Sequence, residues 1–395
     1  MKGKNRWLLP EGIEELLPEQ AARLEQLRRE LLDMYRSWGY ELILPPFIEY
    51  LDGLLTGTGH DLDLKTFKLI DQLSGRLLGL RADMTPQAAR IDAHRLQQDA
   101  PSRLCYLGTV LHTRPDGLAG SRSPLQVGAE LFGHAGVESD VEILALMVAT
   151  LELTGVEDIY IDLGHVGIYR GLASDAGLDD DQEALLFDAL QRKAIPEINE
   201  FLGGLDLSTA QRERLAALAT LNGDSDVLQR ATALLEGSGD ATRNALENLS
   251  RIATLASQRL PDVTLHFDLA ELRGYQYQTG VVFAAFVADH GKEVARGGRY
   301  NEIGKVFGRA RPATGFSTDL RTLMRFGNRD WPVMGKAILA PTDDDAALAD
   351  RVGKLRAAGE AVIQQLPGQE GTFAEMGCDR ILRWNGTEWA VEALA

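Results

Sequence analysis

The strongest constraint on the fold is a change of hydrophobic periodicity along the chain. On both sides of a central stretch, apolar and polar residues alternate with a period of two, which is typical of β-strands with one buried face. Between about residues 171 and 260 the period becomes helical, and leucine- and alanine-rich runs are separated by Gly-Ser-Asp breaks. A sheet interrupted once by helices indicates an α+β fold with a helical insertion.

The individual elements follow from this pattern. The first is an amphipathic helix that begins near Pro18 and ends at Gly39, because proline suits a first helical turn and glycine a helix end. We expect strands at 41–44, 76–83, 104–112, 125–133, 159–163, 263–269 and 281–286, and a helix at 138–153. Together they predict an antiparallel sheet flanked by helices.

The C-terminal residues are expected to form a small unit of their own. Trp331-Pro332 reads as a linker, and a strand at 337–340 and a helix at 345–358 follow it. We therefore predict a core of residues 1–330 that contains the helical insertion, and a small α/β appendage of residues 331–395.

The charge balance narrows the possible functions. Lysine and arginine number 41 against 58 aspartates and glutamates, so the formal net charge is −17. A protein that holds tRNA needs basic side chains against the phosphates, which makes RNA binding disfavoured here. Apolar runs are too short to cross a membrane, and Cys105 and Cys378 lack metal-ligand spacing. We expect a cytoplasmic protein without a metal or cofactor.

Polar residues lie at alternating positions in the segment LRADMT. Arg81, Asp83 and Thr85 would share one face of the strand expected at 76–83. The alternative is a half-exposed sheet whose polar face is simply solvated.

The segment LQVGAELFG shows the same alternation. Gln126, Gly128 and Glu130 would share a face opposite the apolar Val127 and Ala129. A carboxylate and an amide separated by glycine leave room for a small ligand that carries an ammonium or imidazole N–H. A solvated outer face is again the alternative.

Three further segments carry glycine, tyrosine or arginine at positions suited to binding. LRGYQYQTGVVF at 272–283 predicts either a ligand wall or a hairpin with a cross-strand aromatic pair. ARGGRY at 295–300 predicts a glycine-rich loop, which allows close approach of a ligand or forms a plain turn. TGFSTDLRTLM at 314–324 predicts a strand that turns into a helix, with Arg321 in its first turns.

The order and spacing of these segments resemble a known family. Over roughly residues 5–326 the chain resembles histidyl-tRNA synthetases of class II. It resembles still more closely their non-catalytic relatives, the regulatory subunits of short-form ATP phosphoribosyltransferase. The matching segments are WGYELILPPFIEY (first signature, a dimer-forming helix and strand), LRADMT (amino-acid-binding strand), CYLGTVLHTRPDGLAGSRSPLQVGAELFG (second signature), LRGYQYQTG and ARGGRY (histidine motifs) and TGFSTDLRTL (third signature).

The resemblance implies a histidine pocket. Its residues would be Asp83, Thr85, Gln126, Glu130, Arg273 and Tyr277. Asp83 and Glu130 would accept the ammonium and imidazole donors, and Gln126 would hold the polar groups in register. Arg273 matches the arginine that stabilises charge during adenylation in the synthetases.

Departures from the synthetase pattern bear on catalysis. His112 and Arg114 stand where the synthetases carry an ATP-clamping arginine and a glutamate. Imidazole cannot replace a bidentate guanidinium on phosphate, although Arg122 and Arg321 remain as residual nucleotide-site arginines. Residues 335–395 resemble a shortened, acidic version of an anticodon-binding domain, so tRNA is not an expected partner.

These features imply a regulatory subunit without catalytic activity. The resemblance implies a homodimer within a hetero-oligomer, together with a catalytic subunit that condenses ATP with phosphoribosyl pyrophosphate in the first step of histidine biosynthesis. L-Histidine would act as the feedback effector. A short histidyl-tRNA synthetase is the main alternative. A ligase that adenylates an amino acid for another acceptor is the second alternative.

Overall fold

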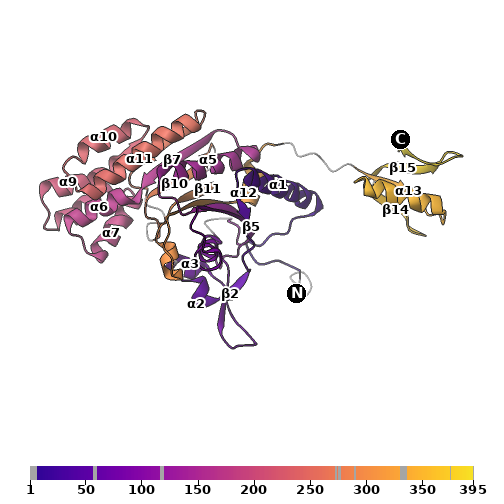
Figure 1. The fold of residues 1–395 in the computed structure, drawn as a ribbon, viewed down its shortest axis with the longest axis horizontal. Coiled ribbons are helices and arrows are strands. Elements are labelled where there is room, and N and C mark those ends of the chain that lie inside the picture. Colours follow the sequence, from indigo (N-terminus) through magenta and orange to yellow (C-terminus); the bar gives the residue numbers. More distant parts are fainter. Residues whose placement is uncertain are drawn as a thin grey trace. The chain divides into compact units, whose positions relative to one another are not determined.

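The chain folds into two compact units, residues 1–329 and 330–395, each with its own sheet (Figure 1). The structure, a computed structural model, describes residues 7–56, 60–115, 120–271, 274, 277–288, 291–329, 336–373 and 375–394. The α+β class predicted from the sequence is confirmed. Trp331-Pro332 lies outside the described residues, so the predicted boundary after residue 330 stays a proposal.

The first unit is built on a nine-stranded sheet in the order β1-β5-β6-β12-β11-β10-β7-β9-β8. Its strands are β1 (Glu41–Leu42), β5 (Ser102–Thr109), β6 (Leu125–Phe132), β7 (Ile159–His165), β8 (Asn222–Gly223), β9 (Thr264–Asp268), β10 (Val281–Val287), β11 (Ala295–Arg299) and β12 (Ala313–Asp319). Neighbouring strands are antiparallel, except that β1 pairs with β5 and β7 with β9 in parallel. The expected antiparallel sheet is therefore present, with a parallel pair near each end.

Two long helices cover one face of this sheet. Helix α1 (Pro18–Ser37) buries Leu27, Leu31 and Tyr35, which recur every four residues along one stripe. Helix α5 (Val137–Leu153) packs on β6, β11 and β12 and is buried on nearly every side, because α1 and α11 cover its outer surface. The ring of Tyr35 meets that of Phe316 on β12 edge to face, with centroids 6.4 Å apart.

The helical insertion lies between β7 and β9 and forms one end of the core (Figure 1). Its helices are α6 (Val166–Ala176), α7 (Asp180–Gln191), α8 (Ile195–Gly203), α9 (Thr209–Ala217), α10 (Asp226–Leu234) and α11 (Asp240–Arg259). Capping boxes at Asp179 and Ser208 begin α7 and α9. The first of these helices begins at Val166, before the composition changes, and the last ends at Arg259.

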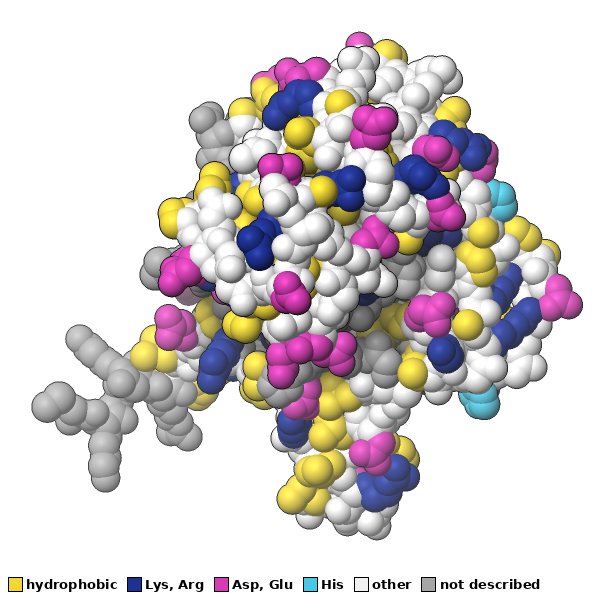
Figure 2. Space-filling view, turned by 90° about the vertical axis from the view of Figure 1, so that its left-hand side faces the viewer, with side chains coloured by type: hydrophobic (Ala, Val, Ile, Leu, Met, Phe, Trp, Pro, Cys, Tyr) yellow, Lys and Arg dark blue, Asp and Glu magenta, His cyan; other side chains and the backbone are white. Residues whose placement is uncertain are grey.

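A small three-stranded sheet projects from the core below the main sheet. It consists of β2 (Ile48–Tyr50), β4 (Leu77–Leu80) and β3 (Lys68–Ile70), in the order β2-β4-β3. Exposed hydrophobic side chains gather on this projection, at the bottom of Figure 2; they include Ile48, Tyr50, Leu69, Ile70, Leu73 and Leu77. The helical insertion faces the viewer above it, where acidic and basic side chains are interspersed.

The second unit has a four-stranded sheet in the order β14-β13-β15-β16. Its elements are β13 (Ala337–Ala340), α13 (Ala346–Ala357), β14 (Val362–Gln364), β15 (Cys378–Trp384) and β16 (Trp389–Ala393). Leu348 and Val352 of α13 pack on Ile338 of the sheet, which gives the unit its own core. In the described part of the chain, none of the helices has the length and apolarity to cross a membrane.

The strand predicted at 76–83 is wrong in its second half, because β4 ends at Leu80. The Asp83 carboxylate accepts a hydrogen bond from the Thr85 N–H at 2.9 Å, and helix α4 (Thr85–Arg90) begins there. Arg81 is buried and donates to the carbonyls of Thr109 and Pro45. The expected shared face of Arg81, Asp83 and Thr85 is therefore absent, since Arg81 turns into the core.

The loop predicted for ARGGRY at 295–300 is also wrong, because residues 295–299 form strand β11 between β10 and β12. A Cβ at Gly297 would overlap the Gly315 carbonyl and the Phe283 ring. Gly298 has φ +157° and lies against the Gln278 side chain. The glycines therefore serve close packing within a sheet, and local sequence does not distinguish this use from a turn.

Candidate functional site

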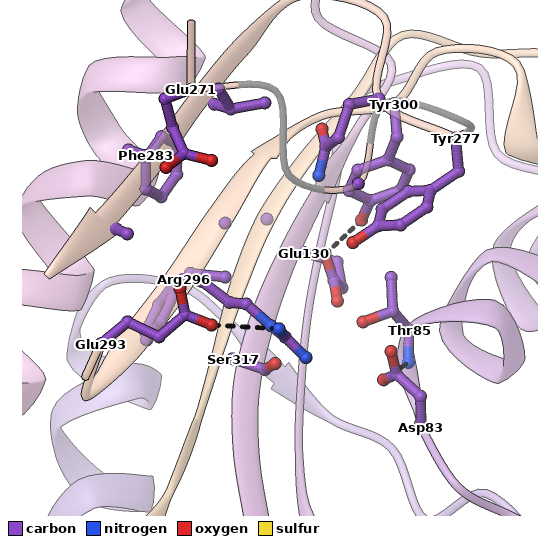
Figure 3. Close-up of a pocket in the computed structure, with 17 residues that line it drawn as sticks. Asp83, Thr85, Glu130, Glu271, Tyr277, Phe283, Glu293, Arg296, Tyr300 and Ser317 are labelled. Atoms are coloured by element: carbon purple, nitrogen blue, oxygen red, sulfur yellow. Dashed lines mark hydrogen bonds and ion pairs between the residues drawn. The ribbon is translucent and has the colours of Figure 1, made fainter. Parts of the chain in front are cut away.

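A cavity of about 70 Å³ opens on the face of the main sheet away from α1 (Figure 3). Ala129 pairs with Phe316, whose ring packs on Tyr35, so the neighbouring Glu130 side chain projects from the opposite face. The lining residues come from the β4–α4 turn, from β6, β10, β11 and β12, and from the segment after β9. This volume can hold several waters or a small polar molecule.

Glu130 is the central residue of the cavity. Its side chain is only 1% exposed and accepts hydrogen bonds from the hydroxyls of Tyr106 (2.8 Å) and Tyr300. Burial raises the pKa of Glu130 to about 8, although the hydrogen bonds from Tyr300 and Tyr106 oppose this shift. Among the described lysines and arginines, none forms an ion pair with it. A buried carboxyl group of this kind is suited to receive a cation from a ligand.

Glycines on three neighbouring strands give the Glu130 carboxylate its space. A Cβ on Gly315 would overlap that carboxylate directly. A Cβ on Gly128 would lie 2.6 Å from both the Tyr106 hydroxyl and the Phe316 carbonyl. Gly297 lies on the next strand, β11, and also lines the cavity. Side chains at these positions would fill the site from below.

Replacing Gly315 by alanine should therefore disturb the site at its floor. We expect Gly315→Ala to lower the free energy of unfolding by about 1–3 kcal/mol, because either the Glu130 carboxyl or the backbone of β12 must move. Chemical denaturation measures this difference. Gly353→Ala is the matched control, because its Cβ would meet open space within helix α13. Equal stability of the Gly315→Ala and wild-type proteins would contradict the packing described here.

Asp83 and Thr85 form a second polar corner of the cavity, on the right in Figure 3. Gln126 lies behind this corner and does not line the cavity. Its Nε2 donates to the Asp83 carboxylate at 2.7 Å, and its Oε1 accepts from the Met84 N–H at 2.9 Å. Gln126 thus fixes the β4–α4 turn to β6. The Thr85 hydroxyl lies 3.0 Å from that of Tyr106, which connects the corner to Glu130.

Tyr277 forms part of the opposite wall. Its ring points into the cavity beside that of Tyr300 (Figure 3), and about two-fifths of the residue is exposed. Gly274 has φ +72° and a Cβ there would lie 2.9 Å from the Tyr277 ring, so this position needs glycine. Arg273 lies outside the described residues, as do Leu272, Tyr275 and Gln276 of the segment 272–283.

Acidic side chains predominate in the lining. Asp83, Glu130, Glu271 and Glu293 all border the cavity, and Arg296 donates to Glu293 at 3.0 Å. The site therefore carries more negative than positive charge, which favours a ligand with a cationic group. Sequence analysis missed Glu271 and Glu293, because no alternation or motif placed them near Glu130, and it did not single out Arg296 within the motif ARGGRY.

The two tyrosines that bind Glu130 were also missed. Tyr106 and Tyr300 are fully buried, and burial raises the pKa of both well above the usual value. One clue existed, since Tyr106 pairs with Gly128 across β5 and β6. A large residue opposite a glycine in a predicted hairpin indicates a side chain that crosses to the neighbouring strand.

The residues that distinguish this chain from the synthetase pattern lie outside the cavity. The His112 ring nitrogen Nε2 lies 2.9 Å from the Ala82 carbonyl, and Arg114 is exposed. Arg122 and Arg321 bind main-chain carbonyl oxygens of residues 11 and 14. The described residues also contain no group of three or more His, Cys, Asp or Glu side chains that could hold a metal.

Comparison with known proteins matches both units. The family model for histidyl-tRNA synthetase covers residues 12–323, and that for the ATP phosphoribosyltransferase subunit HisZ C-terminal domain covers residues 335–392. An ATP phosphoribosyltransferase regulatory subunit of Thioalkalivibrio sulfidiphilus is 62% identical over 395 residues, which is 100% of both chains. Another from Alkalilimnicola ehrlichii is 58% identical and covers 99% of this chain and 98% of that one.

A solved structure has the same architecture. It is a crystal structure of an ATP phosphoribosyltransferase regulatory subunit/histidyl-tRNA synthetase from Bacillus halodurans, with a TM-score of 0.84 and 28% sequence identity. The match covers 96% of this chain and 99% of that chain. The chain therefore belongs to the ATP phosphoribosyltransferase regulatory subunits of histidine biosynthesis, which are non-catalytic members of the histidyl-tRNA synthetase-like class II family.

Proposed function

We propose that the cavity binds L-histidine and makes this regulatory subunit the sensor for feedback control. The observation that carries the proposal is the environment of Glu130, a fully buried carboxyl group with two tyrosine donors and no described cationic partner. An amino-acid ammonium group supplies the missing charge, and Asp83 offers a second acceptor in the same cavity. Histidine carries both the ammonium and the imidazole N–H that such a pair requires.

Selectivity follows from the same arrangement. A site with buried acceptors rejects an analogue that lacks the matching donor, because the acceptor is then desolvated without a partner. Thr85 and Gln126 keep Asp83 and the Tyr106 hydroxyl in place. Tyr277 closes the wall, and Arg273 remains part of the proposed set, outside the described residues.

We further propose that the chain acts in the cytoplasm as a homodimer within a hetero-oligomer. The proposed partner is the catalytic subunit that condenses ATP with phosphoribosyl pyrophosphate, and the names of the relatives support association with an ATP phosphoribosyltransferase. Exposed Leu17, Leu42 and Leu44 support dimerisation through residues 17–46, because an apolar surface of this kind suits a two-fold interface.

Reconstitution tests the proposal. Purified chain should activate the catalytic subunit, and histidine should inhibit the assembly, while histidinol, which keeps the ammonium and imidazole groups, should compete for the cavity. Calorimetry should show that the chain binds histidine without the catalytic subunit. Inhibition without binding to the isolated chain would place the sensor elsewhere. A histidine-dependent ATP–pyrophosphate exchange within about tenfold of an authentic synthetase would contradict the regulatory role.

A further inference from the structure

A second cavity, which we call the β9 groove, lies between α10, α11 and strand β9. The helices α10 and α11 belong to the helical insertion at one end of the core (Figure 1). The groove has a volume of about 640 Å³, which is larger than the cavity around Glu130. None of the residues that line the groove borders that cavity. The groove is therefore a separate place where a partner can bind.

Strand β9 is only partly paired on the side of this groove. On its other side, β9 pairs with β7 along residues 264–267. On the groove side, the short strand β8 pairs only with Phe267 and Asp268. The chain leaves the sheet after Gly223, because α10 begins at Asp226. The first residues of β9 are thus left without a neighbouring strand on this side.

The main-chain groups of Leu265 point toward the unpaired edge. The Leu269 N–H donates to the Leu221 carbonyl at 3.0 Å, on the side of β8. Residues that hydrogen-bond to one neighbour alternate along a strand, so Leu265 directs its N–H and C=O to the same side as Leu269. In the described part of the chain, no strand meets Leu265 there. An edge of this kind can accept an added strand.

The wall of the groove formed by α11 consists of short side chains. Ser250, Thr254 and Ser257 line it, and their hydroxyls donate to carbonyls of the same helix at 2.8, 2.9 and 2.9 Å. These hydroxyl hydrogens are therefore already used within α11. Leu228 and Leu260 add apolar surface. An extended polypeptide fits this groove better than a polar small molecule, because it brings backbone donors and acceptors for the edge of β9.

The charge of the groove also narrows the choice of occupant. Among the described residues that line it, only Asp224 is charged, and its side chain is exposed. Asp226 pairs with Arg230 at 3.6 Å, whereas the described residues supply no ion-pair partner to Asp224. Asp224 directly follows β8, so a strand that continues β8 along β9 would pass beside it. A lysine or arginine in that strand would complement this charge.

Strand β9 connects the groove with the cavity around Glu130. Leu265 and Phe267 line the groove, and Glu271, a few residues further along the chain, lines the cavity. A partner whose activity responds to a ligand in the cavity would thus bind to the same strand that leads into it. This connection favours the catalytic subunit over a second copy of the chain.

We propose that an extended segment of the catalytic subunit adds to the free edge of β9 in the β9 groove. Its backbone supplies a carbonyl to the Leu265 N–H and an N–H to the Leu265 carbonyl. Apolar side chains of the segment pack against Leu228 and Leu260, and a lysine or arginine lies beside Asp224. The inference rests on the proposed function, because it takes the catalytic subunit as the partner.

Filling the groove tests the proposal. Thr254→Trp places a large ring in the groove from an exposed position on α11. We expect this variant to bind the purified catalytic subunit roughly tenfold or more weakly than the wild-type chain, because the ring occupies the place of the added strand. Gln258→Trp is the matched control, since Gln258 is exposed on the same helix outside the groove. Calorimetric titration measures affinity, and chemical denaturation shows that each variant is folded.

Two further measurements address the charge and the backbone of the groove. Asp224→Lys should weaken binding of the catalytic subunit about three- to tenfold, and the difference should shrink at high salt. Asp206→Lys is its control, because Asp206 is exposed in the same insertion but outside the groove. Amide hydrogen exchange at Leu265 should become slower in the complex than in the free chain, because the added strand accepts this N–H.

The outcomes separate this inference from the proposed function. Failure of the wild-type chain itself to bind the catalytic subunit would overturn both. Wild-type binding combined with normal binding of folded Thr254→Trp, or with equal loss in Gln258→Trp, overturns this inference alone. Unchanged exchange at Leu265 in the complex also overturns it. Sedimentation identifies the remaining occupant: if Thr254→Trp dissociates a homodimer and still binds the catalytic subunit, the groove holds a second copy and the inference is wrong.

Discussion

Glu130→Gln is expected to bind histidine about 10- to 100-fold more weakly than the wild-type chain. Glutamine keeps the size of the side chain but cannot become negatively charged beside the ligand ammonium. Loss of a charge-assisted hydrogen bond in a desolvated site costs about 1.5–3 kcal/mol, and each 1.4 kcal/mol is a factor of ten in affinity. Isothermal titration of histidine measures the change, with the exposed Glu302→Gln as the control.

The same variant separates sensing from activation. Feedback inhibition of the reconstituted assembly should weaken in parallel with histidine affinity, while activation of the catalytic subunit should persist, because Glu130 is buried inside the cavity. Coupling is reciprocal, so a substrate of the catalytic subunit that opposes histidine must weaken histidine binding by the same factor. Normal histidine binding combined with lost activation would show that Glu130 has a structural role and that the cavity assignment is wrong.

Histidine affinity should also increase with pH, by about fivefold between pH 7 and pH 8, and then level off. In the empty cavity the pKa of Glu130 is raised to about 8 by burial, so the group is mostly neutral at pH 7. The ligand ammonium requires the carboxylate, and binding below pH 8 therefore releases a proton. Calorimetric titrations in buffers of different ionisation enthalpy detect this proton. The range from pH 7 to pH 8 lies above most of the titration of an imidazole group, which occurs near pH 6.5.

The groups around Glu130 make the assignment testable. Asp83, Tyr277, Tyr300 and Arg296 border the same cavity, and Tyr106 donates a hydrogen bond to Glu130. Burial raises the pKa of Tyr106 and Tyr300, so they stay protonated over this range. Glu130→Gln should remove the pH dependence between 7 and 8. An unchanged slope in that variant would assign the proton to another group.

The free energy of unfolding should change with pH in the opposite direction to histidine affinity. A carboxyl group whose pKa is raised on folding retains a proton that the unfolded chain has lost, so the unfolded state binds fewer protons between about pH 4.5 and 8. The free energy of unfolding of the ligand-free chain should thus fall as pH rises through this window. Comparison with Glu130→Gln by chemical denaturation at pH 5 and pH 8 isolates the contribution of this residue.

Much of the fold could be predicted because its patterns are local. The stripe of Leu27, Leu31 and Tyr35 and the residues Pro18 and Gly39 define α1 within a short window of sequence. The alternation in β6 likewise gives Gln126 and Glu130 a common side of the sheet. The same reasoning gave a wrong prediction for Arg81. The hydrogen bond between Asp83 and Thr85 ends the strand, and the alternation of residues does not record that bond.

The partners inside the site could not be predicted in this way. Tyr300 and Glu130 are brought together by the order of strands β6, β12 and β11, which no single segment specifies. The hydrogen bonds from Arg122 and Arg321 to the carbonyls of Glu11 and Glu14 depend in the same way on where the N-terminal residues lie. Family resemblance supplied Asp83, Thr85 and Tyr277 as candidates, while the acidic character of the remaining lining emerged only from the structure.

The pairing of β6 with β12 has a consequence for synthesis of the chain on the ribosome. Gly315 lies opposite Glu130, and the whole helical insertion is made between them. At a synthesis rate of about 5–20 residues per second, β12 is completed on the order of ten to forty seconds after β6. During that time Val127, Ala129 and Leu131 belong to an unpaired strand edge, a template for wrong pairing. We therefore expect nascent chains of this subunit to need protection by chaperones until β12 has emerged.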